Sequence, residues 1–90
     1  MPQQLAGIAH VGSSSKSAEF VTVRFSTPFT APPAVVVSVM VNEVDQHWVR
    51  FGIEVMSVQK DQFMVEVSML NGHAGWGRDV SVCWIAAEVT

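Results

Sequence analysis

The segment from residue 71 to residue 79, NGHAGWGRD, gathers the side chains of this chain that are best suited to hold a ligand. Asn71, His73 and Arg78 offer directional hydrogen bonds, and Trp76 offers an aromatic face to the C–H side of a sugar or another flat apolar molecule. Three glycines in nine residues predict a loop that adopts unusual backbone angles and presents these groups. Trp76 itself fits a plug of the core and a platform for a ligand equally well.

Patterns for catalysis and for metal binding are missing from the sequence. His10, His47 and His73 are scattered, with no His-x-His or His-x₃-His pair that could begin a zinc site. A nucleophile elbow, a phosphate-binding glycine loop and a dinucleotide fingerprint are also absent. Glu54 and Glu66 are expected on the outward faces of neighbouring strands, where solvated carboxylates are commoner than a glycosidase pair. We therefore expect a protein that is not an enzyme and uses no cofactor or metal.

Charge and hydropathy exclude two classes of partner. Five Lys and Arg residues against eight Asp and Glu residues give a net charge of −3, too little positive charge for a nucleic-acid surface. The longest near-continuous apolar stretch, residues 34–41, is far shorter than the roughly 20 residues of a membrane helix. Met1–Leu5 lacks the basic and apolar parts of a secretory signal, which leaves the localisation open between the cytoplasm and a secreted or surface assembly.

Period-2 alternation predicts a small all-β domain. The strands are expected near residues 7–11, 19–25, 35–41, 51–55, 63–70 and 80–86. Between them, Gly12–Ser15 has the composition of a loop, Pro28–Pro33 that of an extended crossover, 42–47 that of a polar loop and 60–62 that of a hairpin turn. The fold class is thus a six-stranded antiparallel β-sandwich or barrel that forms a single domain over residues 1–90.

Apolar surface is in excess for a chain of 90 residues. Hydrophobic residues make up 49% and charged residues 14%, and a domain of this size buries only about 60–65% of the surface of its unfolded chain. Val36 and Met40 make the second face of strand 35–41 apolar as well, so another subunit is expected to cover it. The single cysteine, Cys83, lies in the apolar run 80–87, which predicts a packed thiol. These features predict a homo-oligomer.

Four segments resemble the H-type lectin domain found in snail agglutinins and at the C-terminal end of discoidins. They are VRFSTPFTAPPAVVVS from Val23, Val49-Arg50-Phe51 opening a strand that ends in Met56-Ser57-Val58, Phe63 after a turn, and VSVCWIA from Val80. Each segment also has a packing role, with Phe25 and Phe29 as plugs and Trp84 in the core. Their common order, over the chain from about Gly7 to Val89, carries the resemblance.

The resemblance implies a trimer, sometimes two trimers face to face, that binds galactose or N-acetylgalactosamine between protomers. Its sites use a Gly-x-Asp element, an Arg, and a His with an aromatic residue. Gly12 matches the glycine, Ser14 stands where the aspartate would be, and Arg50 matches the arginine. His73 and Trp76 are proposed for the last two roles, with Asn71 as a nearby alternative.

Together these observations predict a non-catalytic carbohydrate-binding lectin. Gly12 and Ser14 of one protomer would face Arg50, His73 and Trp76 of its neighbour in a homotrimer or hexamer. Serine accepts weaker hydrogen bonds than a carboxylate, by ~1–2 kcal/mol, which leaves specificity for galactose-type sugars open. The alternative is a structural trimerisation module, of the adhesin or tail-fibre type, that keeps the fold without a working sugar site.

Overall fold

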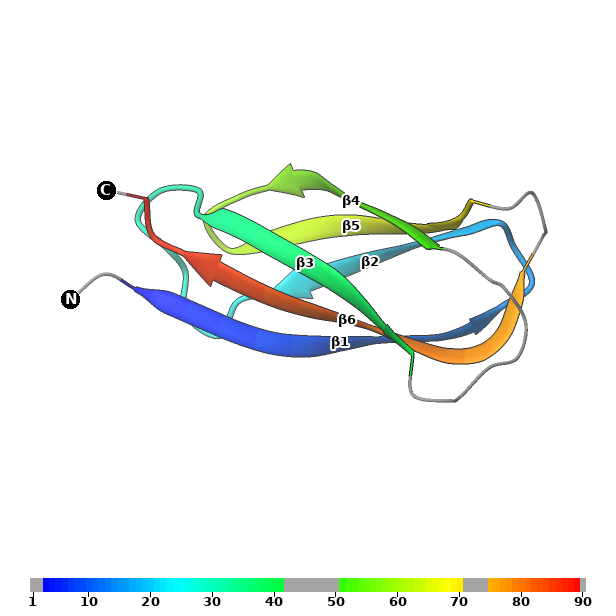
Figure 1. The fold of residues 1–90 in the computed structure, drawn as a ribbon. Coiled ribbons are helices and arrows are strands. Elements are labelled where there is room, and N and C mark those ends of the chain that lie inside the picture. The colour runs from blue at the N-terminus through cyan, green and yellow to red at the C-terminus, as the bar shows by residue number, and fades with distance from the viewer. Residues whose placement is uncertain (1–2, 42–50, 71–74, 90) are drawn as a thin grey trace.

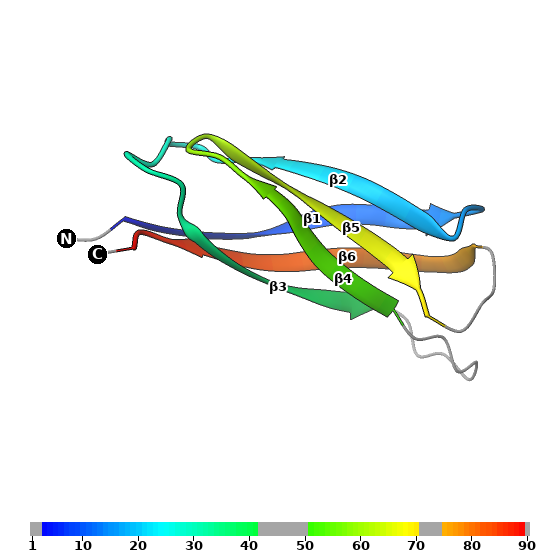
Figure 2. The same ribbon diagram turned by 90° about the horizontal axis from the view of Figure 1, so that it is seen from above.

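The computed structural model describes residues 3–41, 51–70 and 75–89, which form two three-stranded antiparallel sheets. The strands are β1 (Gln4–Ser14), β2 (Ala18–Arg24), β3 (Ala34–Val41), β4 (Phe51–Val58), β5 (Gln62–Met69) and β6 (Trp76–Ala87). One sheet has the order β1-β6-β3 and the other the order β2-β5-β4, and they lie against each other as two layers (Figures 1 and 2). The expected six-stranded sandwich is confirmed.

The core lies between the two sheets and is filled by the side chains at alternate positions of the strands. The most deeply buried side chains come from β5 and β6 and are Phe63, Val65, Val67, Val80 and Val82. Phe25 packs edge-on against Phe29, with ring centroids 5.0 Å apart, and lies 5.8 Å from the ring of Trp84. The predicted packing roles of these three aromatic residues are confirmed.

The crossover between the sheets is tied to the hairpin turn that joins β4 and β5. The amides of Phe25 and Phe29 donate to the carbonyls of Asp61 and Lys60, at 2.9 and 2.8 Å. The turn itself is closed by the Gln59 amide, which donates to the Gln62 carbonyl at 2.8 Å. The hairpin predicted near residues 60–62 is therefore present.

Two strands extend into segments that were expected to be loops. Gly12–Ser14 belongs to β1, because Gly12, with a φ of 81°, sits at a bulge that lets pairing with β6 continue. In the same way, β6 begins at Trp76, within the segment 71–79 that composition had marked as a loop. Glycine and serine favoured a loop at Gly12–Ser15, and glycine alone did so at 71–79. In β1 the ladder instead continues through Gly12–Ser14 with a bulge at Gly12. The predicted polar loop at 42–47 lies outside the described residues.

The outward face of β3 is not covered by the residues that the structure describes. Val36 is 69% exposed, while Val35, Val37 and Val39 on the inner face are half-buried. Cys83, for which a packed thiol was expected, is half-buried on the outer face, where its Sγ lies 3.8 Å from Met40 Sδ. The alternation of β6 explains this, because Val82 and Trp84 point into the core and Cys83 therefore points out.

Both ends of the described chain meet at one end of the sandwich (Figure 1). The Glu88 amide donates to the Gln3 carbonyl, and the Gln3 amide donates to Glu88 Oε2, both at 2.9 Å. The end of β1 and the beginnings of β2 and β6 lie at the opposite end (Figure 1). No helix among the described residues is long and apolar enough to cross a membrane.

Candidate functional site

Three of the six residues singled out in the sequence lie together at the end of the sandwich opposite the termini. Ser14 is the pairing partner of Trp76, and Gly12 is two residues before Ser14 on β1. Arg50, Asn71 and His73 lie outside the described residues. We call the described group at this end, with Glu19 added below, the rim: Gly12, Ser14, Glu19, Gly75 and Trp76.

Trp76 belongs to the rim, and its side chain is part of the hydrophobic core. Its side chain is 4% exposed, and its ring packs edge-on against Phe51, with centroids 5.3 Å apart and planes at 85°. The indole N–H donates to the Gly12 carbonyl at 2.8 Å. Both links lie within one chain, so Trp76 anchors the bulge at Gly12, and in the single chain its ring is covered. Of its two interpretations, the core plug is the one that the structure shows.

Gly75 allows β6 to begin against the end of β1. It has a φ of 87°, and a Cβ at this position would lie 2.7 Å from the Ser14 carbonyl oxygen and 3.0 Å from Ser15 Cα. A side chain there would be strained and would also collide with backbone. The approach of Gly75 is what brings the beginning of β6 into register with Ser14.

Ser14 joins the turn after β1 to a carboxylate on β2. Its Oγ accepts a hydrogen bond from the Lys16 amide at 3.0 Å and donates to Glu19 Oε2. Ser14 and Glu19 are both half-buried. A hydroxyl has one proton to donate, so this contact uses the donor capacity of Ser14.

Glu19 was not singled out in the sequence, although a signal for it was present. It has the same parity on β2 as Val21 and Val23, whose side chains face the other sheet. A carboxylate at an inward position of a strand is uncommon unless a partner accompanies it, since burial without hydrogen bonds is costly. The rim therefore holds a carboxylate, one hydrogen bond away from the position where Ser14 replaces the expected aspartate.

A second polar contact lies beside the rim, where β1 and β6 continue. His10 Nε2 contacts Asp79 Oδ1, and the two side chains are 69% and 42% exposed. No group of three or more potential His, Cys, Asp or Glu ligands for a metal occurs in the part of the chain that the structure describes. His10 thus takes part in a polar pair between two strands.

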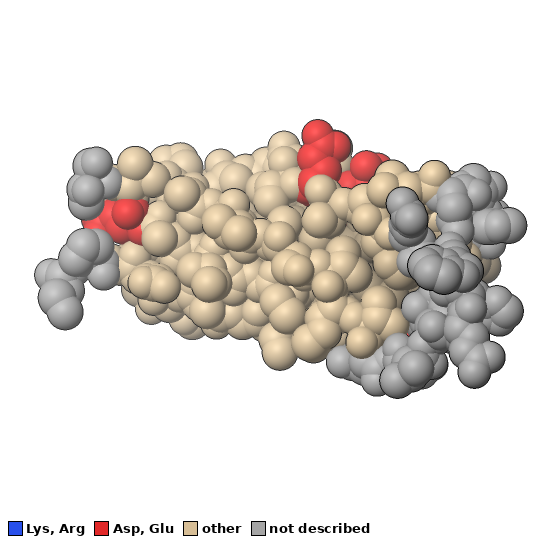
Figure 3. Space-filling view, in the orientation of Figure 1, with Lys and Arg blue, Asp and Glu red and all other residues tan. Residues whose placement is uncertain are grey.

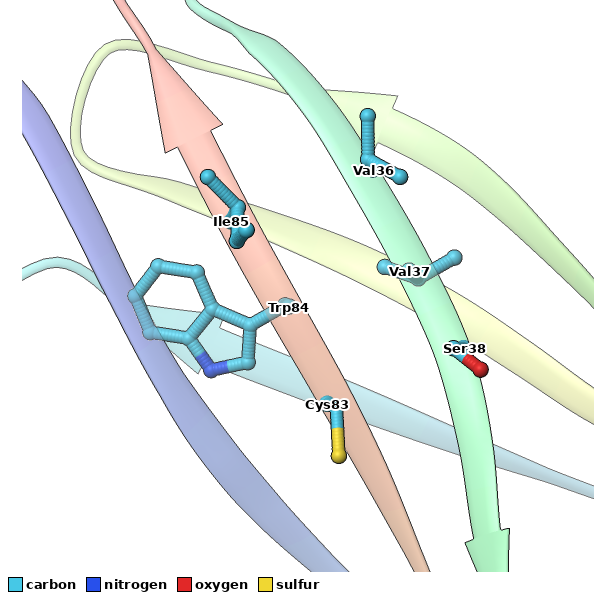
Figure 4. A pocket seen from close by; sticks show the side chains of 6 residues that line it. All are labelled: Val36, Val37, Ser38, Cys83, Trp84 and Ile85. Carbon is cyan, nitrogen blue, oxygen red and sulfur yellow. The ribbon is translucent and has the colours of Figure 1, made fainter.

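A shallow apolar hollow of about 160 Å³ lies elsewhere, on the outer face of the β1-β6-β3 sheet (Figure 4). Its lining comes from β3 and β6 and consists of Val36, Val37, Ser38, Cys83, Trp84 and Ile85. It offers almost no polar group to fix the orientation of a hydroxyl-rich ligand. The rim, with a carboxylate and a glycine bulge, is the better candidate for such a ligand.

Comparisons with known proteins agree with this fold. The family model described as the H-type lectin domain matches residues 20–87. The matched range begins after Gly12, Ser14 and Glu19, so it does not cover that part of the rim. A comparison with curated protein sequences gives no significant match.

Among solved structures, the tailspike gp61 of Pseudomonas phage phi297 is similar, with a TM-score of 0.77 and 15% sequence identity. The match covers 98% of this chain and 16% of the tailspike chain, so this chain corresponds to a small part of that protein. At this identity the likeness shows a common fold.

Proposed function

The chain belongs to the H-type lectin domain family, and we propose that it is a carbohydrate-binding module of galactose or N-acetylgalactosamine type without catalytic activity. The observation that carries the proposal is the rim, where Trp76 holds Gly12 beside Ser14 at one end of the sandwich. In this proposal Gly12 and Ser14 form one wall of the site. Arg50, His73 and Asn71 supply hydrogen bonds from a neighbouring protomer, and Trp76 supports the wall from behind.

The outer face of the β1-β6-β3 sheet supports assembly as a trimer. Within residues 4–10, 34–40 and 81–87, the outward positions of its strands are occupied by Gln4, Ala6, Ile8, His10, Ala34, Val36, Ser38, Met40, Ser81, Cys83, Ile85 and Ala87. None of these carries a fixed charge, and no Lys or Arg is visible among the described residues in the space-filling view of this side (Figure 3). Ile8 and Val36 are 64% and 69% exposed in the single chain. Contiguous apolar surface of this kind is typical of an interface with another copy.

Sugar binding is tested by a glycan array, followed by calorimetric titration with millimolar galactose and N-acetylgalactosamine. We expect weak single sites, made useful by multivalency in a trimer whose mass is checked by light scattering. Arg50→Ala should abolish binding and leave the mass unchanged. A folded trimer that binds no hexose or N-acetylhexosamine would refute the proposal.

The second candidate is a structural trimerisation module without a sugar site. Two observations favour it: Ser14 stands in place of the family carboxylate, and the same fold forms 16% of a phage tailspike chain. In that case Arg50→Ala would change neither the oligomer nor any partner interaction. Loss of ligand binding in this variant decides for the lectin.

A further inference from the structure

The hydrogen bonds of the rim leave Ser14 and Glu19 with different capacities to bind a ligand. The Ser14 hydroxyl donates its only proton in a hydrogen bond to Glu19 Oε2, and its oxygen accepts a hydrogen bond from the Lys16 amide. A hydroxyl bound in this way has one lone pair left. It is therefore a poor donor for a sugar and a good support for the carboxylate next to it.

Glu19 keeps the larger capacity for a ligand. A carboxylate has about four lone-pair positions, and of the described residues only Ser14 makes a hydrogen bond to it. Its inward parity on β2 and its half-burial place the side chain at the rim, partly shielded from solvent. Hydrogen bonds from hydroxyls to a carboxylate are charge-assisted and stronger than those to a neutral oxygen.

We infer that Glu19 supplies the carboxylate that accepts hydrogen bonds from hydroxyl groups of a bound sugar, and that Ser14 is its positioning residue. This inference rests on the proposed sugar-binding function. In this arrangement a glutamate at the beginning of β2 takes the role of an aspartate at position 14, the last residue of β1, and the Ser14 hydroxyl links the two positions. Because this carboxylate belongs to a side chain of β2, the bound sugar should sit closer to β2 than an aspartate at position 14 would hold it.

The decisive variant is Glu19→Gln, which keeps the shape of the side chain and removes its charge. Calorimetric titration of the whole chain with methyl galactoside and N-acetylgalactosamine should show a loss of affinity of roughly tenfold or more. Oligomer mass and melting temperature should stay those of the parent. The matched control is Glu54→Gln, which lies on the outer face of the same β2-β5-β4 sheet, where affinity should change by less than about twofold.

Two further variants keep the inference testable if Glu19→Gln is poorly folded. Ser14→Ala removes only the hydrogen bond that holds the carboxylate, and affinity should fall several-fold. Ser14→Asp in the Glu19→Gln background returns a carboxylate to the rim, and affinity should recover to within about threefold of the parent.

The outcomes separate this inference from the proposed function. If the parent binds sugar, Arg50→Ala abolishes binding and Glu19→Gln binds as the parent does, the inference is overturned and the function stands. If the parent binds no sugar, both fail together. A selective loss in Glu19→Gln with recovery in the double variant supports both.

Discussion

The outer faces of the two sheets differ in charge although both are partly apolar. The β1-β6-β3 face carries no fixed charge over residues 4–10, 34–40 and 81–87, and the polar contact of His10 with Asp79 lies next to the rim. The β2-β5-β4 face carries Glu54 and Glu66 directly opposite each other. A face that remains in water can keep such charges, whereas a face that enters an interface has to pair or avoid them. The comparison favours the β1-β6-β3 sheet for the proposed interface with another copy.

The largest expected effect is dissociation of the oligomer by a charge on the uncharged face. Val36→Lys would bury an unpaired ammonium in each contact, at a cost of several kcal/mol. Light scattering should show monomers. Phe20→Lys is the matched control, because Phe20 is also apolar and exposed, at 57%, and lies beside Glu66 on the other sheet. If Phe20→Lys dissociates the oligomer and Val36→Lys does not, the assignment of the two faces is reversed.

The next effect concerns access to the Cys83 thiol. It is half-buried on the uncharged face in the single chain and should be covered in the oligomer. A soluble disulfide reagent should therefore label Cys83 roughly tenfold faster in Val36→Lys than in the parent. Phe20→Lys should label at the rate of the parent. Equal rates in all three proteins would contradict a buried interface at this face.

The smallest effect is on the charged face itself. Glu54 and Glu66 are cross-strand partners, and like charges directly opposite each other are unfavourable by roughly 0.2–1 kcal/mol. Glu54→Gln should raise the free energy of unfolding by that amount at low salt, and the gain should shrink as salt is added. Urea unfolding at two salt concentrations measures it. A loss of stability in this variant would mean that Glu54 has a favourable partner in the assembled protein.

Much of the fold follows from alternation along the chain. Val21 and Val23 on β2, or Phe63, Val65 and Val67 on β5, have a period that only a strand with one buried face explains. The length of β1 was not predictable in this way, because Gly12 and Ser14 have the composition of a loop whether they bend a ladder or leave it. Whether these residues form a loop or continue the strand depends on pairing with β6, which local composition does not show.

The rim was predictable only in part, for a related reason. The sequence indicated Gly12, Ser14 and Trp76, but glycines on both sides of Trp76 fit an exposed platform as well as a buried plug. The bond from Trp76 to Gly12 spans 64 residues and becomes visible only in three dimensions. Glu19 is only five residues from Ser14, yet its role depends on which way its strand faces.

The hydrogen-bonded pair of Gln3 and Glu88 has a practical consequence for attaching this domain to something else. Both ends of the described chain leave from the end of the sandwich farthest from the rim (Figure 1). If either terminus is attached to a surface, a fluorophore or a further domain, the rim should face away from the point of attachment. The same molecule can thus be immobilised from either side for the binding measurements described above without covering its candidate site.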